Sequence, residues 1–191
     1  TTLHGTDSTL VGREGTMEAV VTWSIQNSDA GTAVSESLKQ DTYKHFDISK
    51  DITVVPNFID FTRFNKQKKE HFKKAIAPNN EKILVHTSNF RKVKRVGDVV
   101  RVFAKVSKKI PCKLLLIGDG PERASIEKIC REEDILCDNI TFLGKQDAIE
   151  EILSVCDLFL LTSESESFGL AALEAMACQV PVISTNAGGI P

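Results

Sequence analysis

The sequence lacks any apolar run long enough to cross a membrane. Its longer apolar stretches, such as Leu158–Leu161, fall far short of the roughly 20 residues that a transmembrane helix needs. The first seven residues contain neither an initiator methionine nor the charged start and apolar core of a signal peptide. Residues 188–191 are predicted to be a loop. We therefore expect an internal fragment of a longer, cytoplasmic protein.

A strong charge excess is also missing. The formal net charge of −2 predicts no general attraction to nucleic acid or to anionic membranes. Hydrophobic residues make up 41% and charged residues 26%, which is ordinary for a globular protein and argues against disorder. The 191 residues are enough for one sizeable domain, or for one domain and part of another. The composition leaves a homo-oligomer open.

The cysteines are too few and too scattered for a disulfide framework or a zinc site. There are five of them, an odd number, and no C-x-x-C pair occurs. We expect buried, reduced thiols. The residues concerned are Cys112, Cys130, Cys137, Cys156 and Cys178.

A basic, polar stretch at residues 65–74, closed by 77–80, divides the chain. It contains no apolar run suited to a central strand, so residues 65–80 are predicted to be a surface linker with one short helix. Residues 1–64 would then be the end of one domain, and 81–191 a second domain.

Strands and helices alternate along the chain. Before the linker we expect strands at 31–35 and 51–56, and helices at 17–28 and from Glu36. After it, strands are expected at 82–86, 112–117, 139–143, 157–161 and 180–184, with helices at 96–107, 122–133, 148–154 and 168–177. Continuous apolar strands separated by helices predict a doubly wound α/β domain with a parallel sheet. Ligands of such sheets bind beyond the carboxyl ends of the strands, which here are the loops 87–94, 118–121, 144–147 and 162–169.

The last of these loops carries two glutamates around a predicted helix start. Backbone N–H groups of Ser167, Phe168 and Gly169 would open the helix and suit a diphosphate. Glu166 and Glu174 would then accept hydrogen bonds from sugar hydroxyls. The alternative makes Glu166 a helix-start charge and Glu174 a solvated residue. It fits Glu174 poorly, because the residues around Glu174 are nearly all apolar.

Glu166 and Glu174, separated by seven residues and followed by the stretch 175–191, resemble the signature of the retaining GT-B glycosyltransferases of family 4. This resemblance implies that Glu174 binds the nucleotide ribose and that Glu166 contacts the donor sugar. It also implies that Ser167, Phe168, Gly169 and Leu170 form the donor-binding helix start. The expected fold is GT-B, with a Rossmann-like C-terminal domain and the end of a similar N-terminal domain.

Residues 88–95 place four cations within five positions, in the loop after the first strand of the second domain. Arginine and lysine suit a diphosphate that gains charge as its glycosyl bond breaks. Composition alone leaves a solvated basic loop equally open. The resemblance implies that Arg91 and Lys94 hold the donor diphosphate. This loop is shorter than the family pattern, so Lys94 and Arg95 are not ranked.

Two further motifs gain a role only through the resemblance. A lone histidine such as His4 is more often structural, whereas the family places a histidine here that faces the donor sugar. The Gly118–Pro121 turn could suggest a dinucleotide site, but Arg123 replaces the third glycine of that motif. The family instead uses Gly118, and the turn at Gly144, near the nucleotide base.

The stretches 1–7, 88–95 and 166–170 together resemble one subgroup, which transfers N-acetylglucosamine from UDP-GlcNAc to L-malate in bacillithiol biosynthesis. No cofactor and no metal site are expected, because the basic loop can replace a cation. A basic residue that contacts the acceptor in related enzymes is missing from 22–27, and a role for Arg13 is unsupported. Another acceptor, a hydrolysing epimerase and a non-catalytic binding fragment stay open.

Overall fold

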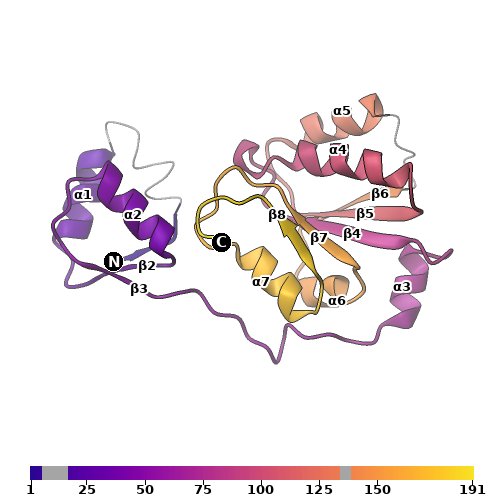
Figure 1. The fold of residues 1–191 in the computed structure, drawn as a ribbon, viewed down its shortest axis with the longest axis horizontal. Helices are drawn as coiled ribbons and strands as arrows, with labels where there is room; N and C mark the ends of the chain where they lie inside the picture. Colours follow the sequence, from indigo (N-terminus) through magenta and orange to yellow (C-terminus); the bar gives the residue numbers. More distant parts are fainter. Residues whose placement is uncertain (6–16, 134–138) are drawn as a thin grey trace. The chain divides into compact units, whose positions relative to one another are not determined.

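The computed structural model describes residues 1–5, 17–133 and 139–191. They form two compact units (Figure 1). The first unit contains Thr1–Phe58, Ser165–Gly169 and Asn186–Pro191, and the second contains Ile59–Glu164 and Leu170–Thr185. No helix in these described ranges has the length and apolar character needed to cross a bilayer.

The first unit is built on a small parallel sheet of order β1-β2-β3, formed by Thr2–Leu3, Gly31–Ala33 and Ile52–Val54. Helices α1 (Glu18–Gln26) and α2 (Glu36–His45) connect these strands. The Ser35 hydroxyl caps α2 by accepting a hydrogen bond from Leu38 N at 3.1 Å. The core of this unit consists of Leu3, Ile25, Ala33, Val34, Leu38 and Ile52, with Phe168 packed against it.

The second unit is a parallel sheet of order β6-β5-β4-β7-β8. Its strands are β4 (Lys82–Thr87), β5 (Cys112–Ile117), β6 (Ile140–Gly144), β7 (Leu158–Leu161) and β8 (Val182–Ser184). Helices α4 (Val96–Ser107) and α5 (Arg123–Glu132) cover one face (Figure 1). The other face is covered by α3 (Glu70–Ile76), α6 (Ile149–Leu153) and α7 (Leu170–Ala177). The predicted doubly wound α/β domain is confirmed.

Burial explains why these segments adopt this architecture. Strand β5 does not alternate between buried and exposed residues: Leu114, Leu115 and Leu116 are all buried, because helices lie on both faces of the sheet. Helix α4 buries Val96, Val99, Val100 and Phe103, which lie on one stripe of the helix. These side chains pack with the central strands in one apolar cluster.

The predicted linker 65–80 contains α3 and lies within the second unit. The backbone carbonyl of Asn65 accepts a hydrogen bond from Ser154 Oγ at 3.1 Å, and Lys73 Nζ lies 3.0 Å from Asp157 Oδ1. Arg63, just before the linker, forms an ion pair with Glu150 at 3.1 Å. The proposed domain bounds 1–64, 65–80 and 81–191 stay predictions.

The helix predicted at 168–177 begins two residues later than expected, at Leu170. Gly169 precedes it with a φ of +85°, which lies outside helical conformation. The N–H groups at the start of α7 are therefore those of Leu170 and the residues that follow it.

The strand order places a topological switch point between β4 and β7. The chain leaving β4 runs on to β5 on one side, and the chain leaving β7 runs on to β8 on the other side. In an open parallel sheet, ligands bind at such a point, outside the carboxyl ends of the two strands. The basic loop after β4 and the loop that begins at Thr162 both start there.

Candidate active site

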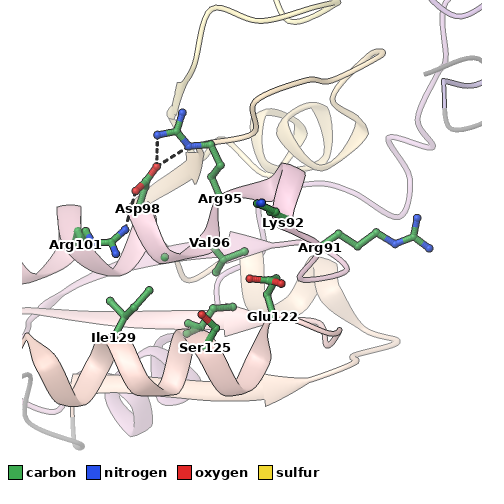
Figure 2. A pocket seen from close by; sticks show the side chains of 11 residues that line it. Arg91, Lys92, Arg95, Val96, Asp98, Arg101, Glu122, Ser125 and Ile129 are labelled. Atoms are coloured by element: carbon green, nitrogen blue, oxygen red, sulfur yellow. Dashed lines mark hydrogen bonds and ion pairs between the residues drawn. The ribbon is translucent and has the colours of Figure 1, made fainter. Parts of the chain in front are cut away.

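The basic loop after β4 contains one short 3₁₀ turn, η2 (Lys92–Lys94), followed by Arg95 in the left-handed region with a φ of +49°. Arg95 Nε lies 2.7 Å from Asp98 Oδ2, and Arg101 Nη1 lies 3.1 Å from Asp98 Oδ1. Figure 2 shows both arginines turned toward Asp98, while the Arg91 side chain extends the opposite way. Arg95 is therefore engaged by Asp98.

Arg91 differs from Arg95 in being available to a ligand. Its side chain is exposed and forms no ion pair or hydrogen bond within the part of the chain that the structure describes. Lys94 is half-buried at the end of η2. Arg95 is already paired with Asp98, and the order of Lys94 and Arg95 as diphosphate ligands stays unassigned. The phosphate-binding roles of Arg91 and Lys94 stay predictions.

A pocket of about 230 Å³ lies between the starts of α4 and α5 (Figure 2). Among the predicted donor-site residues, Arg91 lines it. Its other cations include Arg95 and Arg101, whose charge Asp98 already balances in part. Of the residues predicted to bind the donor, this pocket therefore contains Arg91 and not Lys94 or Glu174.

The far end of the basic loop is held by the segment that follows β7. Thr162 Oγ1 donates a hydrogen bond to the Lys94 and Arg95 carbonyls, at 3.1 Å each. Glu164 N donates to the Val93 carbonyl at 2.8 Å. The two loops at the switch point thus fix one another's backbone. A threonine directly after an apolar strand was the available sequence signal, and sequence reasoning missed it.

The Gly118–Gly120 turn packs directly on the start of the basic loop. Gly118 has a φ of +112°, and a Cβ built on it would lie 1.8 Å from the Ser88 carbonyl oxygen. A Cβ on Gly120 would lie 2.0 Å from the Asn89 carbonyl oxygen. These glycines therefore allow the close approach of two backbones. The roles of Gly118 and Gly144 near a nucleotide base stay predictions. Gly144 has a φ of +66° and open space around a built Cβ.

Glu174 is half-buried in α7. Its carboxylate forms no hydrogen bond or ion pair with any residue that the structure describes. Burial raises the pKa of Glu174, the positive charge of Arg63 opposes this shift, and the charge of Glu150 adds to it. A half-buried carboxylate of this kind can accept hydrogen bonds, so it is suited to a polar ligand whose hydroxyl groups donate them.

The first unit brings together His4, Glu166, Ser167 and Phe168. Ser167 Oγ donates a hydrogen bond to the His4 carbonyl at 2.6 Å, and the side chain of His4 is exposed. Gly189 N donates to the Glu166 carbonyl at 2.8 Å. A Cβ on Gly188 would lie 2.0 Å from that same carbonyl oxygen, so this turn also depends on glycine. The predicted ligand contacts of these residues stay predictions.

One buried hydroxyl at the end of β4 lacks a partner. Thr87 Oγ1 is buried and accepts or donates no hydrogen bond within the described residues. Leaving such a group unsatisfied costs about 1–3 kcal/mol. Its position beside the switch point is one where a bound ligand or a water molecule can satisfy it.

Cysteines and metal ligands contribute no further chemistry in the described ranges. No group of three or more His, Cys, Asp or Glu side chains there is arranged to hold a metal ion. Cys112, Cys130, Cys156 and Cys178 carry thiols rather than disulfides. Burial, with a smaller contribution from the charge of Asp157, raises the pKa of Cys156 to about 12. Arg13 and Cys137 lie outside the described residues.

Comparison with known families assigns the class of the protein. The profile of the family described as glycosyl transferases group 1 matches residues 67–191, and that of glycosyltransferase family 4 matches residues 1–63. The chain belongs to the group 1/family 4 glycosyltransferases, as the two glutamates predicted.

One curated relative is a protein of Bacillus anthracis named N-acetyl-alpha-D-glucosaminyl L-malate synthase. It is 50% identical over 192 residues, which cover 100% of this chain and 50% of that protein. An uncharacterized glycosyltransferase of Methanocaldococcus jannaschii is 27% identical over 82% of this chain and 42% of its own length. The chain spans about half the length of the curated relatives it matches.

Solved structures confirm the GT-B fold. Anabaena HepE, in complex with UDP and glucose, superposes with a TM-score of 0.86 at 20% identity, covering 98% of this chain and 52% of that chain. Staphylococcus aureus TarM, in complex with alpha-GlcNAc-glycerol and UDP among other ligands, gives a TM-score of 0.78 at 24% identity. The match covers 97% of this chain and 36% of TarM.

Proposed function

We propose that the full-length protein transfers N-acetylglucosamine from UDP-GlcNAc to L-malate, with retention of configuration at the anomeric carbon. One observation carries this proposal: the 50% identity to a malate synthase extends over the whole chain. Both family profiles support glycosyl transfer in general. The acceptor and the stereochemistry are the finer parts of the proposal.

The donor would bind through its diphosphate and its two sugars. Arg91 and Lys94 would balance the charge of the diphosphate, since Arg91 is exposed and has no partner among the described residues. Glu174 would accept hydrogen bonds from the ribose, and Glu166 from the donor sugar. Support for a UDP-sugar comes from HepE and TarM, whose solved complexes contain UDP.

The reaction we propose is a same-face attack. The malate hydroxyl oxygen forms a bond to the anomeric carbon, while the bond from that carbon to the diphosphate oxygen breaks. The hydroxyl proton passes to the departing diphosphate. Negative charge grows on the diphosphate as its bond breaks, so cations held in place beforehand lower the barrier. The residues suggest no second carboxylate as a covalent nucleophile.

Product analysis of the purified full-length protein tests the function. The protein is incubated with UDP-GlcNAc, with and without L-malate, and the products are identified by mass spectrometry. We expect UDP and GlcNAc-malate only when malate is present. Free N-acetylhexosamine formed without malate would instead identify a hydrolysing epimerase. Transfer to another acceptor, and none to malate, would identify a family 4 glycosyltransferase with a different acceptor.

A further inference from the structure

His86 is a histidine inside the core of the second unit, two residues before the basic loop. It lies in β4, its side chain is fully buried, and its ring packs near the rings of Phe90 and Phe159, with centroids 6.4 Å apart in each case. A polar ring at such a position needs hydrogen-bond partners. Its two ring nitrogens both find a partner at the switch point.

The partners of His86 determine which ring nitrogen carries the proton. Nδ1 lies 2.8 Å from the Leu160 carbonyl oxygen, which can only accept, so Nδ1 donates. In a neutral ring Nε2 then accepts, and Ser88 Oγ, 2.9 Å away, donates to it. In this tautomer the ring donates to β7 through Nδ1 and accepts from Ser88 through Nε2.

Ser88 links the His86 ring to the backbone of the basic loop through hydrogen bonds. With its proton turned toward His86, Ser88 Oγ accepts a hydrogen bond from Phe90 N at 3.3 Å. Phe90 is fully buried and has a φ of +38°, a conformation that a non-glycine residue keeps only when its surroundings hold it. The Phe90 carbonyl also accepts from Glu122 N at 3.0 Å. The next residue is Arg91.

Hydrogen bonds join the Leu160 carbonyl, the His86 ring, Ser88 Oγ and Phe90 N into one chain, here called the relay. The relay connects the two strands of the switch point. Leu160, whose carbonyl accepts from His86, belongs to β7, and the residues just after β7 hold the other end of the basic loop through Thr162 and Glu164. We propose that His86, acting through Ser88, is a positioning residue that sets the conformation of residues 88–95. It thereby places Arg91 and Lys94 for the donor diphosphate, so this inference rests on the proposed function.

A matched pair of substitutions in the full-length protein tests the relay. Ser88→Ala removes the hydroxyl, whereas Ser88→Thr keeps it. The affinity for UDP is measured by NMR titration, which needs no acceptor. We expect Ser88→Ala to weaken UDP binding about 10-fold and Ser88→Thr to stay within about 3-fold of the parent, because small misplacements of binding groups cost large factors. Equal losses in both variants, or none in Ser88→Ala, would overturn the relay.

A double-mutant cycle separates positioning from a merely structural role. If Ser88 acts through the two cations, Ser88→Ala changes UDP affinity by less than about 2-fold in the background Arg91→Ala/Lys94→Ala. A full effect of about 10-fold in that background would contradict the proposal. A parent protein that binds UDP but transfers nothing to malate would refute the proposed function and leave the relay intact.

Discussion

At the residue scale, the cations of one loop differ because their partners differ. Arg95 is held by Asp98, whereas Arg91 in the same loop is exposed and has no partner in the described part of the chain. A guanidinium that is not already paired is the better ligand for an incoming diphosphate, since binding breaks no existing ion pair. Diphosphate binding at this loop should therefore depend on where each cation lies and whether it is already paired, rather than on the total number of positive charges.

Arg91→Ala or Lys94→Ala should lower the turnover of the full-length protein by roughly 10- to 1,000-fold, because each change removes stabilisation of the departing diphosphate. Lys92→Ala is the matched control, since it removes an exposed cation of the same loop. Steady-state kinetics with saturating UDP-GlcNAc measure the effect. A normal rate in Arg91→Ala, or an equal loss in Lys92→Ala, would remove the proposed role.

Glu174→Gln should weaken donor binding without lowering the stability of the fold. Loss of the charged acceptor should weaken donor binding by roughly 10- to 100-fold. Burial raises the pKa of Glu174, so the fold favours the protonated form. The stability that the protonated Glu174 carboxyl contributes is present below the ordinary pKa of a glutamate. It is lost as pH rises through the raised pKa of the folded state. Glutamine mimics the neutral form, and the thermal midpoint at neutral pH should therefore rise or stay unchanged.

The two readouts for Glu174→Gln are donor KM and thermal melting. A variant that binds the donor normally and melts at a lower temperature would show that Glu174 serves the fold. That result would contradict its assignment to the ribose.

At the scale of elements, Asp157 joins three segments of the second unit. Its carboxylate, just before β7, accepts from Ile83 N at 2.9 Å in β4, and lies 3.0 Å from Lys73 Nζ in α3. Lys82 Nζ is 3.5 Å away. Burial disfavours the charge, but the hydrogen bond from Ile83 and the two lysines outweigh it and lower the pKa of Asp157.

A lowered pKa means that the stability due to Asp157 is present above its ordinary pKa and is lost as pH falls through the lowered value. Asp157→Asn should therefore cost about 1–3 kcal/mol at neutral pH, and the cost should shrink below pH ~3.9. Urea denaturation of the full-length protein and the variant, at neutral pH and below pH ~3.9, measures the difference in their free energies of unfolding. Glu132→Gln is the control, because its ion pair with Lys128 is mostly exposed and should contribute little. A pH-independent cost would contradict this role of the Asp157 charge.

At the scale of the whole molecule, periodicity was enough to predict the alternation of strands and helices. Runs such as Cys112–Ile117 and Val96–Ser107 have the bounds expected from their apolar patterns. The two glutamates likewise identified the family. These signals are local, since each depends on residues within one element and its adjoining loop.

Features that depend on distant partners could not be predicted. His86 belonged to a predicted apolar strand, and its bond to Leu160 spans 74 residues of sequence. The pairing of Arg95 with Asp98 occurs with a left-handed backbone at Arg95, which no local pattern indicated. The use of Gly118 to admit the Ser88 carbonyl is likewise visible only in three dimensions.

Transfer by the full-length protein should retain the configuration at the anomeric carbon of the donor. The donor UDP-GlcNAc has the α configuration at its anomeric carbon. The most direct test is therefore proton NMR of the first GlcNAc-malate product formed from it. We expect an α-linked product, identified by the small coupling between the protons on the first two carbons of the sugar. A β-linked first product, with the large coupling of that anomer, would contradict retention.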